Sequence, residues 1–548
     1  MNIAAYLPKM AQTVPYQRAV VFPHSRDRWG RVSYTHLTFQ QLNEEADRYA
    51  HGFTNLGFRK GMRVLLMVRP SLEFIALTFA LFKIGAVPIL IDPGMGKSNL
   101  LDCIASVEPE GLVAVPMVHL ARFIYRRYFR SVRCSVMVGA KFPWIGAVPL
   151  DQVRLKVWRP YKVAEAKDTD MAAILFTTGS TGSPKGVVYL HGMFDAQVRL
   201  IQQHYGIRPG EVDLPGFPLF ALFSIAMGMT CIIPDMDPTK PSQVDPVKIV
   251  EAIHNQGVTN SFGSPAIWRR VTEYCLREGI RLPSLRRILM AGAPVPAAIL
   301  KSFTSILAED ADTYTPYGAT EALPVASISG REILAETEEK TRSGAGVCVG
   351  LPLPTIRVRI IEIIDRAICS WSEVKELPKG EIGEIVVCGP VVTHEYYNRG
   401  EATALAKVFD GQNVWHRMGD VGYLDDAGRL WFCGRMAHRV VTPKGTLFTI
   451  PCEAIFNQHP EVFRTALVGI GKRPNQKPLI IVELRGGRMP KGKAETDRLI
   501  NELRELGQKS PLTRQIEDFL FHPAFPVDIR HNAKIFREKL AVWAERGL

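Results

Sequence analysis

Short apolar runs alternate with longer amphipathic stretches along most of this chain. Val64–Val68 and Val87–Ile91 have the length and composition of buried strands, whereas Thr38–Leu56 and Asp245–Gln256 have helical spacing. The first of these helices starts with a Thr-x-x-Gln pattern, which predicts a capping box. Strands that alternate with helices in this way are typical of layered α/β folds.

The pattern changes toward the C-terminus. Glu381–Gly389 and Gly428–Gly434 are short apolar strands punctuated by glycine, and Ala466–Ile470 and Leu479–Glu483 predict strands of a separate α+β region. A chain of 548 residues also exceeds the roughly 100–200 residues of a usual domain. We therefore predict an α/β fold with a large layered N-terminal domain with a β-rich end, residues 1–436, and a small mobile α+β domain, residues 437–548.

The composition, 47% hydrophobic and 22% charged, is typical of a globular enzyme. The N-terminus lacks the basic and apolar regions of a signal peptide. The most apolar window, Phe74–Leu90, contains Lys83, Gly85 and Pro88 and is shorter than the ~20 residues of a membrane span, so it predicts a buried helix and a strand. Nine cysteines without a Cys-x-x-Cys pair favour a reduced cytoplasm and argue against zinc.

The net charge is +13, but no nucleic-acid-binding motif accompanies it, so we expect no nucleic-acid partner. One basic cluster stands apart between Arg122 and Arg133, where five arginines alternate with Phe123, Tyr125, Tyr128 and Phe129. Two interpretations remain open: a basic amphipathic helix that touches a membrane surface or a protein partner, or a solvated helix that packs its aromatic rings inward.

The richest chemical motif runs from Phe176 to Gly186 and reads FTTGSTGSPKG. Small residues leave backbone N–H groups free to face a polyphosphate, hydroxyls add donors, and Lys185 adds a positive charge. The spacing from Gly182 to Lys185 excludes a Walker A loop. Apolar runs at Met171–Phe176 and Val187–His191 predict a hairpin-like turn between two strands.

This segment resembles the signature loop of the adenylate-forming superfamily, which includes acyl- and aryl-CoA ligases, peptide-synthetase adenylation domains and luciferases. Further segments match that superfamily in order along the chain: Gly292-Ala293-Pro294, Tyr317-Gly318-Ala319-Thr320-Glu321, Trp415–Asp420, Gly434-Arg435 and the segment that ends at Lys534. The resemblance therefore covers nearly the whole chain and implies the use of ATP and Mg²⁺.

The resemblance also implies a role for each matched residue. Adenine would lie against Tyr317 and the backbone of Gly292, Ala293 and Pro294, with Gly318, Ala319 and Thr320 beside it, and the ribose would meet Asp420 and Arg435. Glu321 would hold Mg²⁺, and Lys185 with the loop residues Thr177, Thr178, Gly179, Ser180, Thr181 and Gly182 would hold the β- and γ-phosphates. Lys534 would bridge the substrate carboxylate and the α-phosphate, which makes Lys534, Lys185, Glu321 and Arg435 the expected catalytic residues.

Three departures from the superfamily pattern narrow the range of reactions that the chain is expected to catalyse. Ala221 stands where an aromatic or histidine gate is common, His438 stands at the hinge position that is usually Asp or Lys, and the lysine segment reads PVDIRHNAK. These features are similar to the bacterial β-lactone synthetases of olefin biosynthesis. Such enzymes activate a long-chain 2-alkyl-3-hydroxy acid, whose own hydroxyl then attacks, so no external thiol is needed.

That resemblance predicts β-lactone formation, with assembly among other hydrocarbon-biosynthesis enzymes. A long-chain fatty acyl-CoA ligase is the alternative, because the two families share most of these motifs. A non-catalytic nucleotide sensor or scaffold is a third reading. This third hypothesis is disfavoured because the chain contains all of the expected catalytic and nucleotide-binding side chains, Lys185, Glu321, Asp420, Arg435 and Lys534. A sensor has no need for a lysine supplied by a second domain.

Overall fold

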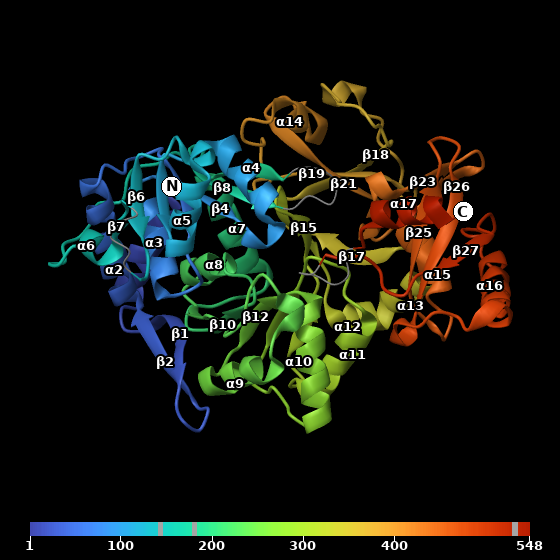
Figure 1. Cartoon of the computed structure of the whole chain (residues 1–548), viewed down its shortest axis with the longest axis horizontal. Helices are drawn as coiled ribbons and strands as arrows, with labels where there is room; N and C mark the ends of the chain where they lie inside the picture. The colour runs from blue at the N-terminus through green and yellow to red at the C-terminus, as the bar shows by residue number, and fades with distance from the viewer. Residues whose placement is uncertain (141–145, 178–183, 529–534, 548) are drawn as a thin grey trace.

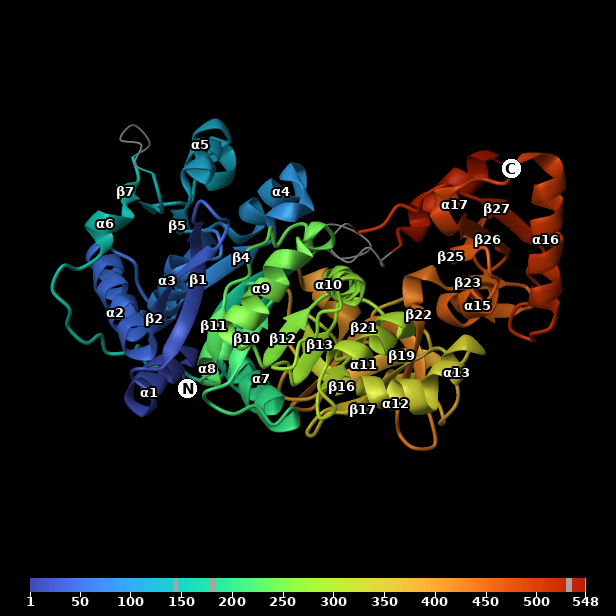
Figure 2. The ribbon, with the colours of Figure 1, turned by 90° about the horizontal axis from the view of Figure 1, so that it is seen from below.

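The computed structural model describes residues 1–140, 146–177, 184–528 and 535–547. It confirms the predicted α/β class: a large body of three sheets with their helices is followed by a small C-terminal body (Figure 1). Figure 2 shows the small body at one end of the molecule, beyond the last sheet of the large body. Among the described residues, no helix combines the length and apolar character needed to cross a membrane.

The first seven-stranded sheet carries the phosphate-loop hairpin at its edge. Its strands are parallel except at β8 and β9, which are antiparallel and pair Phe176 with Gly186, as the apolar runs predicted. In spatial order they are β7 (Val148–Pro149), β6 (Cys134–Met137), β5 (Gly111–Ala114), β3 (Arg63–Met67), β4 (Val87–Ile91), β8 (Met171–Thr177) and β9 (Lys185–Leu190).

The second seven-stranded sheet is also parallel apart from its outer hairpin, β1 with β2. Its order is β14 (Asp312–Tyr314), β13 (Arg287–Met290), β12 (Asn260–Gly263), β10 (Val212–Pro215), β11 (Thr230–Ile232), β1 (Arg18–Arg26) and β2 (Val32–Thr38). Ligands bind at the carboxyl ends of parallel strands in open α/β sheets, so both sheets have an edge suited to a site.

The third sheet is antiparallel and forms the predicted β-rich end of the large body. It comprises β15 (Tyr317–Ala319), β16 (Ala322–Ser327), β17 (Val347–Pro352), β22 (Leu430–Arg435), β21 (Asn413–Leu424), β19 (Gly383–Cys388) and β18 (Arg357–Ile361), with β20 (Lys407–Asp410) paired to β21. Strands β15, β21 and β22 carry the Tyr317, Asp420 and Arg435 motifs, so one sheet supplies the expected base and ribose contacts.

The C-terminal body contains separate small sheets, β23 (Val440–Thr442) with β24 (Gly445–Leu447), and β25 (Val462–Ile470) with β26 (Lys477–Leu484) and β27 (Asp518–Phe521). Helices α15 (Thr449–Phe456), α16 (Gly492–Gln508) and α17 (Arg537–Gly547) accompany them. The division of the chain between residues 436 and 437 stays a prediction.

Helices of the large body flank and separate its sheets (Figures 1 and 2). They are α1 (Tyr6–Thr13), α2 (Phe39–Asn55), α3 (Leu72–Lys83), α4 (Lys97–Val107), α5 (Pro116–Ile124), α6 (Leu150–Val153), α7 (His191–His204), α8 (Phe220–Ala226), α9 (Pro246–Gln256), α10 (Pro265–Glu278), α11 (Ala297–Ile306), α12 (Gly330–Glu332), α13 (Glu338–Arg342) and α14 (Gly400–Ala406). The predicted capping box is present, because Thr38 accepts from Gln41 N and the Gln41 side chain accepts from Thr38 N.

The expectation of one helix across Arg122–Arg133 was wrong. Helix α5 ends at Ile124, because Tyr125 leaves the helical conformation, and a 3₁₀ turn covers Arg126–Phe129. The turn directs Phe129 into the core, whereas Phe123 remains 62% exposed. The aromatic residues of this segment are therefore divided between the core and the surface, and neither simple interpretation of the cluster holds for all of them.

A buried ion pair joins the two helices that pack between the first two sheets. Lys83, in α3, is 1% exposed and donates to Asp47 of α2 over 2.5 Å and to Asn43 Oδ1 over 2.7 Å. Burial lowers the pKa of Lys83, and the Asp47 charge opposes that effect. The pair fixes α2 against α3 inside the largest apolar cluster, which includes residues of both sheets.

We expect Asp47→Ala to lower the free energy of unfolding by about 3–5 kcal/mol, because Lys83 would keep a buried charge without its carboxylate partner. Urea denaturation followed by tryptophan fluorescence measures the change. Glu45→Ala is the matched control on the same helix: it breaks the half-exposed pair with Arg154 and should cost less than about 1 kcal/mol. Equal losses in the two variants would contradict the assignment.

Candidate active site

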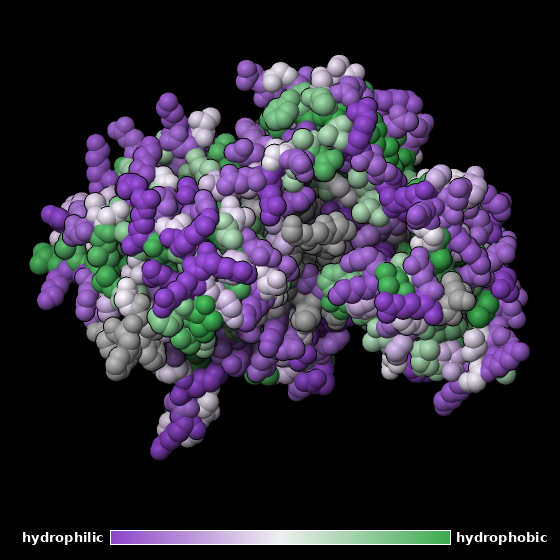
Figure 3. Space-filling view, turned by 45° about the horizontal axis from the view of Figure 1, so that its top comes forward, coloured by the Kyte–Doolittle hydropathy of each residue, from purple (hydrophilic) through white to green (hydrophobic). Residues whose placement is uncertain are grey.

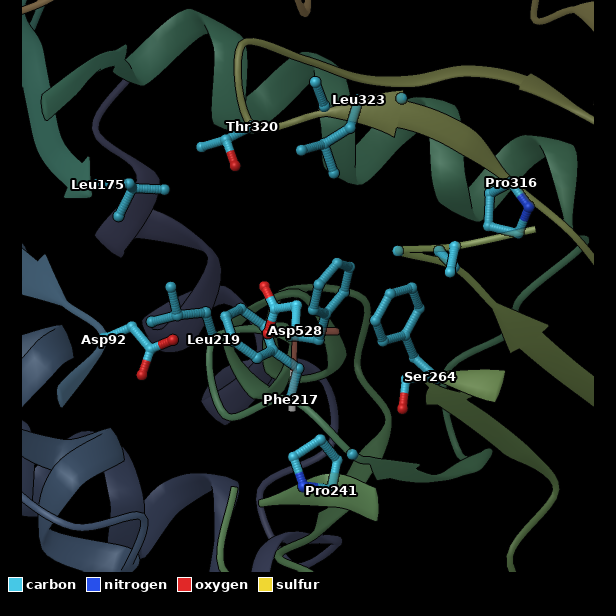
Figure 4. Close-up of a pocket in the computed structure, with 18 of the residues that line it drawn as sticks. Asp92, Leu175, Phe217, Leu219, Pro241, Ser264, Pro316, Thr320, Leu323 and Asp528 are labelled. Atoms are coloured by element: carbon cyan, nitrogen blue, oxygen red, sulfur yellow. The ribbon is translucent and has the colours of Figure 1, made fainter. Parts of the chain in front are cut away.

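A large cavity of about 2110 Å³ lies where the three sheets and the C-terminal body meet. Residues from each of these parts line it, including Leu175 of the first sheet, Phe217 and Ser264 beside the second, Thr320 beside the third and Asp528 of the C-terminal body. In Figure 4, the side chains of Leu175, Leu219, Phe217 and Leu323 border one space, with Thr320 and Asp528 beside it. The cavity therefore has a polar end near the motifs and an extended apolar part.

The polar end contains a hydrogen-bonded group of Tyr317, Asp420 and Arg435. Asp420 and Arg435 are register partners on the antiparallel strands β21 and β22, and Arg435 Nη1 lies 2.9 Å from Asp420 Oδ1. The Tyr317 hydroxyl donates to Asp420 Oδ2 over 2.7 Å. Burial and the adjacent Asp420 charge raise the pKa of Tyr317 well above its usual value, so the phenol stays protonated and keeps this hydrogen bond.

A second group surrounds Glu321. The Tyr396 hydroxyl donates to Glu321 Oε1 over 2.7 Å, and Lys185 Nζ lies 4.9 Å from the centre of the Tyr396 ring. Thr393 fixes the backbone of Glu321, since its N and Oγ1 donate to Glu321 O over 2.8 and 3.0 Å. The ring of Tyr396 thus separates the expected metal carboxylate from the expected phosphate lysine.

The sequence analysis missed Tyr396. An isolated bridge pairs Tyr396 with Val187, and Tyr397 N donates to Gly186 O over 2.8 Å. These contacts join segments about two hundred residues apart in the sequence, which no local periodicity reveals. A Tyr-Tyr-Asn segment after an apolar strand was the only local signal, and it does not indicate a site by itself.

The sequence analysis also missed a buried basic pair behind Glu321. Lys407, 1% exposed, donates to Thr393 Oγ1 over 3.1 Å, and its register partner on β21 is His416. Burial lowers the pKa of Lys407 to about 7, and burial together with Lys407 holds the pKa of His416 well below its usual value. His416 is therefore neutral near pH 7, and its Nδ1 lies 3.1 Å from Ala406 O.

The structure brings Gly292, Ala293, Pro294, Gly318, Ala319 and Thr320 to the wall of the same cavity. Gly292 has φ +92°, a conformation that L side chains rarely adopt. The Tyr189 hydroxyl donates to Thr320 O over 2.6 Å, and Gln197 donates to Leu323 O over 2.9 Å. These buried donors hold the backbone that leads from the nucleotide motif to the apolar part.

Several predicted residues lie outside the described residues: Thr178, Gly179, Ser180, Thr181, Gly182 and Lys534. For Thr177 only the backbone, at the end of β8, is described. The flanks of the lysine segment, Asp528 and Ile535, both line the cavity. Arg537 anchors the following helix through a bidentate pair with buried Glu453, with distances of 2.7 and 2.6 Å from Nη2 to the two carboxylate oxygens.

Two of the positions that depart from the superfamily pattern, Ala221 and His438, also line the cavity. Ala221 is 3% exposed in α8, next to Phe220, whose ring stacks on Phe262 with centroids 3.8 Å apart. His438 closes the 3₁₀ turn Met436–His438, and its Nε2 lies 3.7 Å from Glu538 Oε2. A hinge at His438 stays a prediction.

The chain belongs to the AMP-binding enzyme family, whose model matches residues 8–397. This membership confirms the superfamily resemblance drawn from the motifs. Two relatives match almost end to end. The olefin beta-lactone synthetase of Xanthomonas campestris pv. campestris is 48% identical over 99% of this chain and 97% of its own, and that of Stenotrophomonas maltophilia is 46% identical over 100% and 98%.

A solved structure supports the fold. The o-succinylbenzoate coenzyme A synthetase MenE of Bacillus subtilis, in complex with ATP and magnesium ion, superposes with a TM-score of 0.74 over 98% of each chain at 20% identity. The family uses ATP, and the cavity residues fit that ligand: an aromatic ring, a carboxylate beside an arginine, and a lysine are the groups that a base, a ribose and phosphates require.

The donor set also fits Mg²⁺. Glu321 is one carboxylate at the polar end, and Mg²⁺ commonly takes one or two carboxylates and completes its octahedron with substrate phosphates and water. Across the described ranges, no cluster of three or more His, Cys, Asp or Glu side chains could hold a metal by itself. Glu321 is therefore the residue that would hold the ion together with ATP.

We predict that Asp420→Ala raises the Kd for ATP by about ten- to a hundredfold, because losing charged hydrogen bonds costs about 1.5–3 kcal/mol. Isothermal titration with ATP measures the change. Asp426→Ala, on the exposed turn of the same β21–β22 hairpin, is the control and should leave Kd unchanged. Tyr317→Phe keeps the ring and removes one donor to Asp420, so it should weaken ATP binding less than Asp420→Ala does. If the Kd for ATP is unchanged in Asp420→Ala, the role of Asp420 is purely structural.

Proposed function

We propose that this protein converts a long-chain 2-alkyl-3-hydroxy acid and ATP into a β-lactone, AMP and pyrophosphate. The observation that carries the proposal is the end-to-end identity of 48% and 46% with two olefin beta-lactone synthetases. Those relatives also bear out the predicted ligase class and the predicted similarity to β-lactone synthetases. The proposed reaction therefore belongs to olefin biosynthesis.

The first step is adenylation. The substrate carboxylate attacks the α-phosphorus of ATP, the bond to the β-phosphate oxygen breaks, and pyrophosphate leaves. Negative charge grows on the α-phosphate and on the leaving group, so preorganised cations lower the barrier. We assign Lys185 to the β- and γ-phosphates and Lys534 to the α-phosphate and carboxylate. Mg²⁺ held by Glu321 supplies further charge neutralisation when it is bound.

The second step is ring closure. The substrate's 3-hydroxyl attacks the carbonyl carbon of the acyl-adenylate and releases its proton to solvent, while the bond from that carbon to the phosphate oxygen breaks and AMP leaves with its electron pair. Because nucleophile and electrophile belong to one molecule, the enzyme only has to hold them in a reactive geometry. No thiol has to enter for this step. This agrees with the presence of Ala221 at the position where an aromatic or histidine gate is common.

The apolar part of the cavity suits two alkyl chains. Three largely apolar segments contribute lining residues: Phe220 to Phe223, then Phe262, Ser264 and Ile267, then Leu323. Trp268 instead packs in the core. Burying long methylene chains is favourable by about 0.8 kcal/mol per CH₂, so this surface favours a lipid-like acid over a small aromatic one.

Other partners stay proposals. We infer assembly with other enzymes of hydrocarbon biosynthesis and peripheral membrane contact through Arg122–Arg133.

We also infer that the protein works in the cytoplasm. The cytoplasm supplies the ATP that the reaction requires, and all nine cysteines are free thiols in the structure, as a reducing compartment would keep them.

We expect Lys534→Ala to reduce pyrophosphate exchange by at least about a hundredfold with little change in the Kd for ATP, because a preorganised charge at the reacting phosphate contributes about 10²–10³ in rate. Exchange of labelled pyrophosphate into ATP measures the first step. Lys539→Ala, five residues further on in α17, is the matched control and should retain wild-type exchange. Exchange at the wild-type rate in Lys534→Ala would remove Lys534 from the chemistry.

A 2-alkyl-3-hydroxy acid given with ATP and Mg²⁺ should yield AMP and a β-lactone at a rate that does not depend on CoA. The corresponding acid without the hydroxyl should stop at the adenylate, because it contains no internal nucleophile. Mass spectrometry of products, with and without CoA, tests both statements. A thioester as main product, with AMP release that requires CoA, would instead establish the long-chain acyl-CoA ligase.

A further inference from the structure

Helix α5 lies beside the first sheet at the outside of the molecule (Figure 2), and several of its apolar side chains are exposed. Met117, Leu120, Phe123 and Ile124 are 72%, 47%, 62% and 62% exposed. Their spacing places them along one side of a nine-residue helix. In the space-filling view, apolar side chains gather over this part of the molecule and are bordered by hydrophilic ones (Figure 3).

The opposite side of α5 is fixed to the protein. His119 is 1% exposed, and its Nε2 lies 3.1 Å from Val136 O of β6. Arg122 Nη1 donates to Ser135 Oγ over 3.0 Å. The exposed face is therefore held in place by a rigid sheet and is not the flank of a loose segment.

Positive charge surrounds this apolar face. Arg126, Arg127, Arg130 and Arg133 are exposed, and Arg126 lies over the Phe123 ring at 4.4 Å. The sequence contains no Asp or Glu between Glu110 and Asp151. The acidic partner that the structure gives these four arginines is Glu108, 3.7 Å from Arg130 across an exposed pair. Apolar residues beside exposed arginines complement an anionic lipid surface.

The same helix also forms part of the substrate cavity. Val115, Met117 and Val118, at the start of α5, line it, together with Leu66 and Met67 at the end of β3 and Leu90 and Ile91 at the end of β4. Met117 is thus at once the most exposed of the four apolar residues and part of the cavity wall. The cavity wall therefore includes a surface-exposed residue of α5, close to the carboxyl ends of these parallel strands.

We infer that α5 and the arginines that follow it dock on an anionic membrane surface, and that the acid substrate passes from the lipid into the cavity through an opening at Met117. This inference rests on the proposed function, because a 2-alkyl-3-hydroxy acid with two long chains partitions into lipid and not into water. Docking the opening on the bilayer would let the chains enter without crossing water.

The first test is binding of the full-length protein to vesicles, measured by flotation. We expect binding to vesicles of equal parts phosphatidylcholine and phosphatidylglycerol, weaker binding to pure phosphatidylcholine, and release by salt. Arg126→Glu/Arg127→Glu/Arg130→Glu should lower the partition coefficient by about a hundredfold or more, because each basic residue contributes about fivefold at an anionic surface. Lys493→Glu/Arg504→Glu/Lys509→Glu, on exposed positions of α16 and its C-cap, is the charge-matched control and should still bind.

The apolar face has its own variant and control. Leu120→Ser/Phe123→Ser/Ile124→Ser leaves the cavity wall intact and should reduce vesicle binding by at least about tenfold, since three side chains lose their burial in the interface. Val247→Ser/Leu276→Ser/Val542→Ser removes comparable exposed apolar residues elsewhere and should bind as wild type. Circular dichroism spectra and thermal unfolding curves check that the variants fold.

The second test separates this inference from the proposed function. AMP release should fall in both α5 variants when a long-chain acid is supplied in anionic vesicles, and stay at the wild-type rate with a short, water-soluble 3-hydroxy acid. Equal vesicle binding by wild type and variants, or no binding by any of them, would overturn the inference even if the β-lactone forms. Self-association that the serine variant abolishes, without vesicle binding, would overturn it in favour of a second copy. Vesicle binding with a thioester product would instead contradict the proposed function alone.

Discussion

The carboxylate of Asp420 interacts with two other residues of the candidate nucleotide site, Arg435 and Tyr317. It lies on β21, its register partner Arg435 lies on β22, and the Tyr317 hydroxyl reaches it from β15 at the other side of the same sheet. A residue slip in the β21–β22 register would turn either side chain to the opposite face. The pairing therefore positions the ring of Tyr317 and the guanidinium of Arg435 around one carboxylate, and the last residues of β22 lead directly into the C-terminal body.

A second constraint lies behind Glu321. The Glu321 backbone is held by Thr393, whose hydroxyl also accepts from Lys407, and the Glu321 carboxylate accepts from Tyr396. Burying a lysine at this place costs desolvation, which is why its pKa falls to about 7. The arrangement holds the carboxylate of this cavity-lining residue through one oxygen, which accepts from a phenol. The second oxygen would then be available to Mg²⁺, which takes oxygen ligands.

Local patterns were predicted well, because their causes are local. The capping box at Thr38, the hairpin of β8 and β9, and the buried helix α3 before β4 follow from spacing within a few residues. Tyr396 could not be found in this way, since it reaches the site by pairing with Val187, about two hundred residues away in the sequence. Lys407 could not be found either, because its link to Glu321 runs through the side chain of Thr393. The break at Tyr125 was missed for a related reason: burial of Phe129 by the fold prevailed over the helical pattern of the arginine-rich segment.

The two ends of the cavity impose opposite requirements on the protein. Adenylation needs fixed charges in a site from which water is excluded. In the proposed mechanism Lys185, Arg435 and Lys534 would supply these charges, and the large body and the C-terminal part of the chain would have to meet for all three to act together. The apolar part needs a route by which long alkyl chains arrive without passing that polar end. The inferred entry at Met117 of α5, a cavity-lining residue that is exposed at the surface, would separate the two routes. Because the hydroxyl that closes the lactone enters with the acid, no third passage for a thiol is required, and Ala221 can pack as a small core residue beside the stacked rings of Phe220 and Phe262.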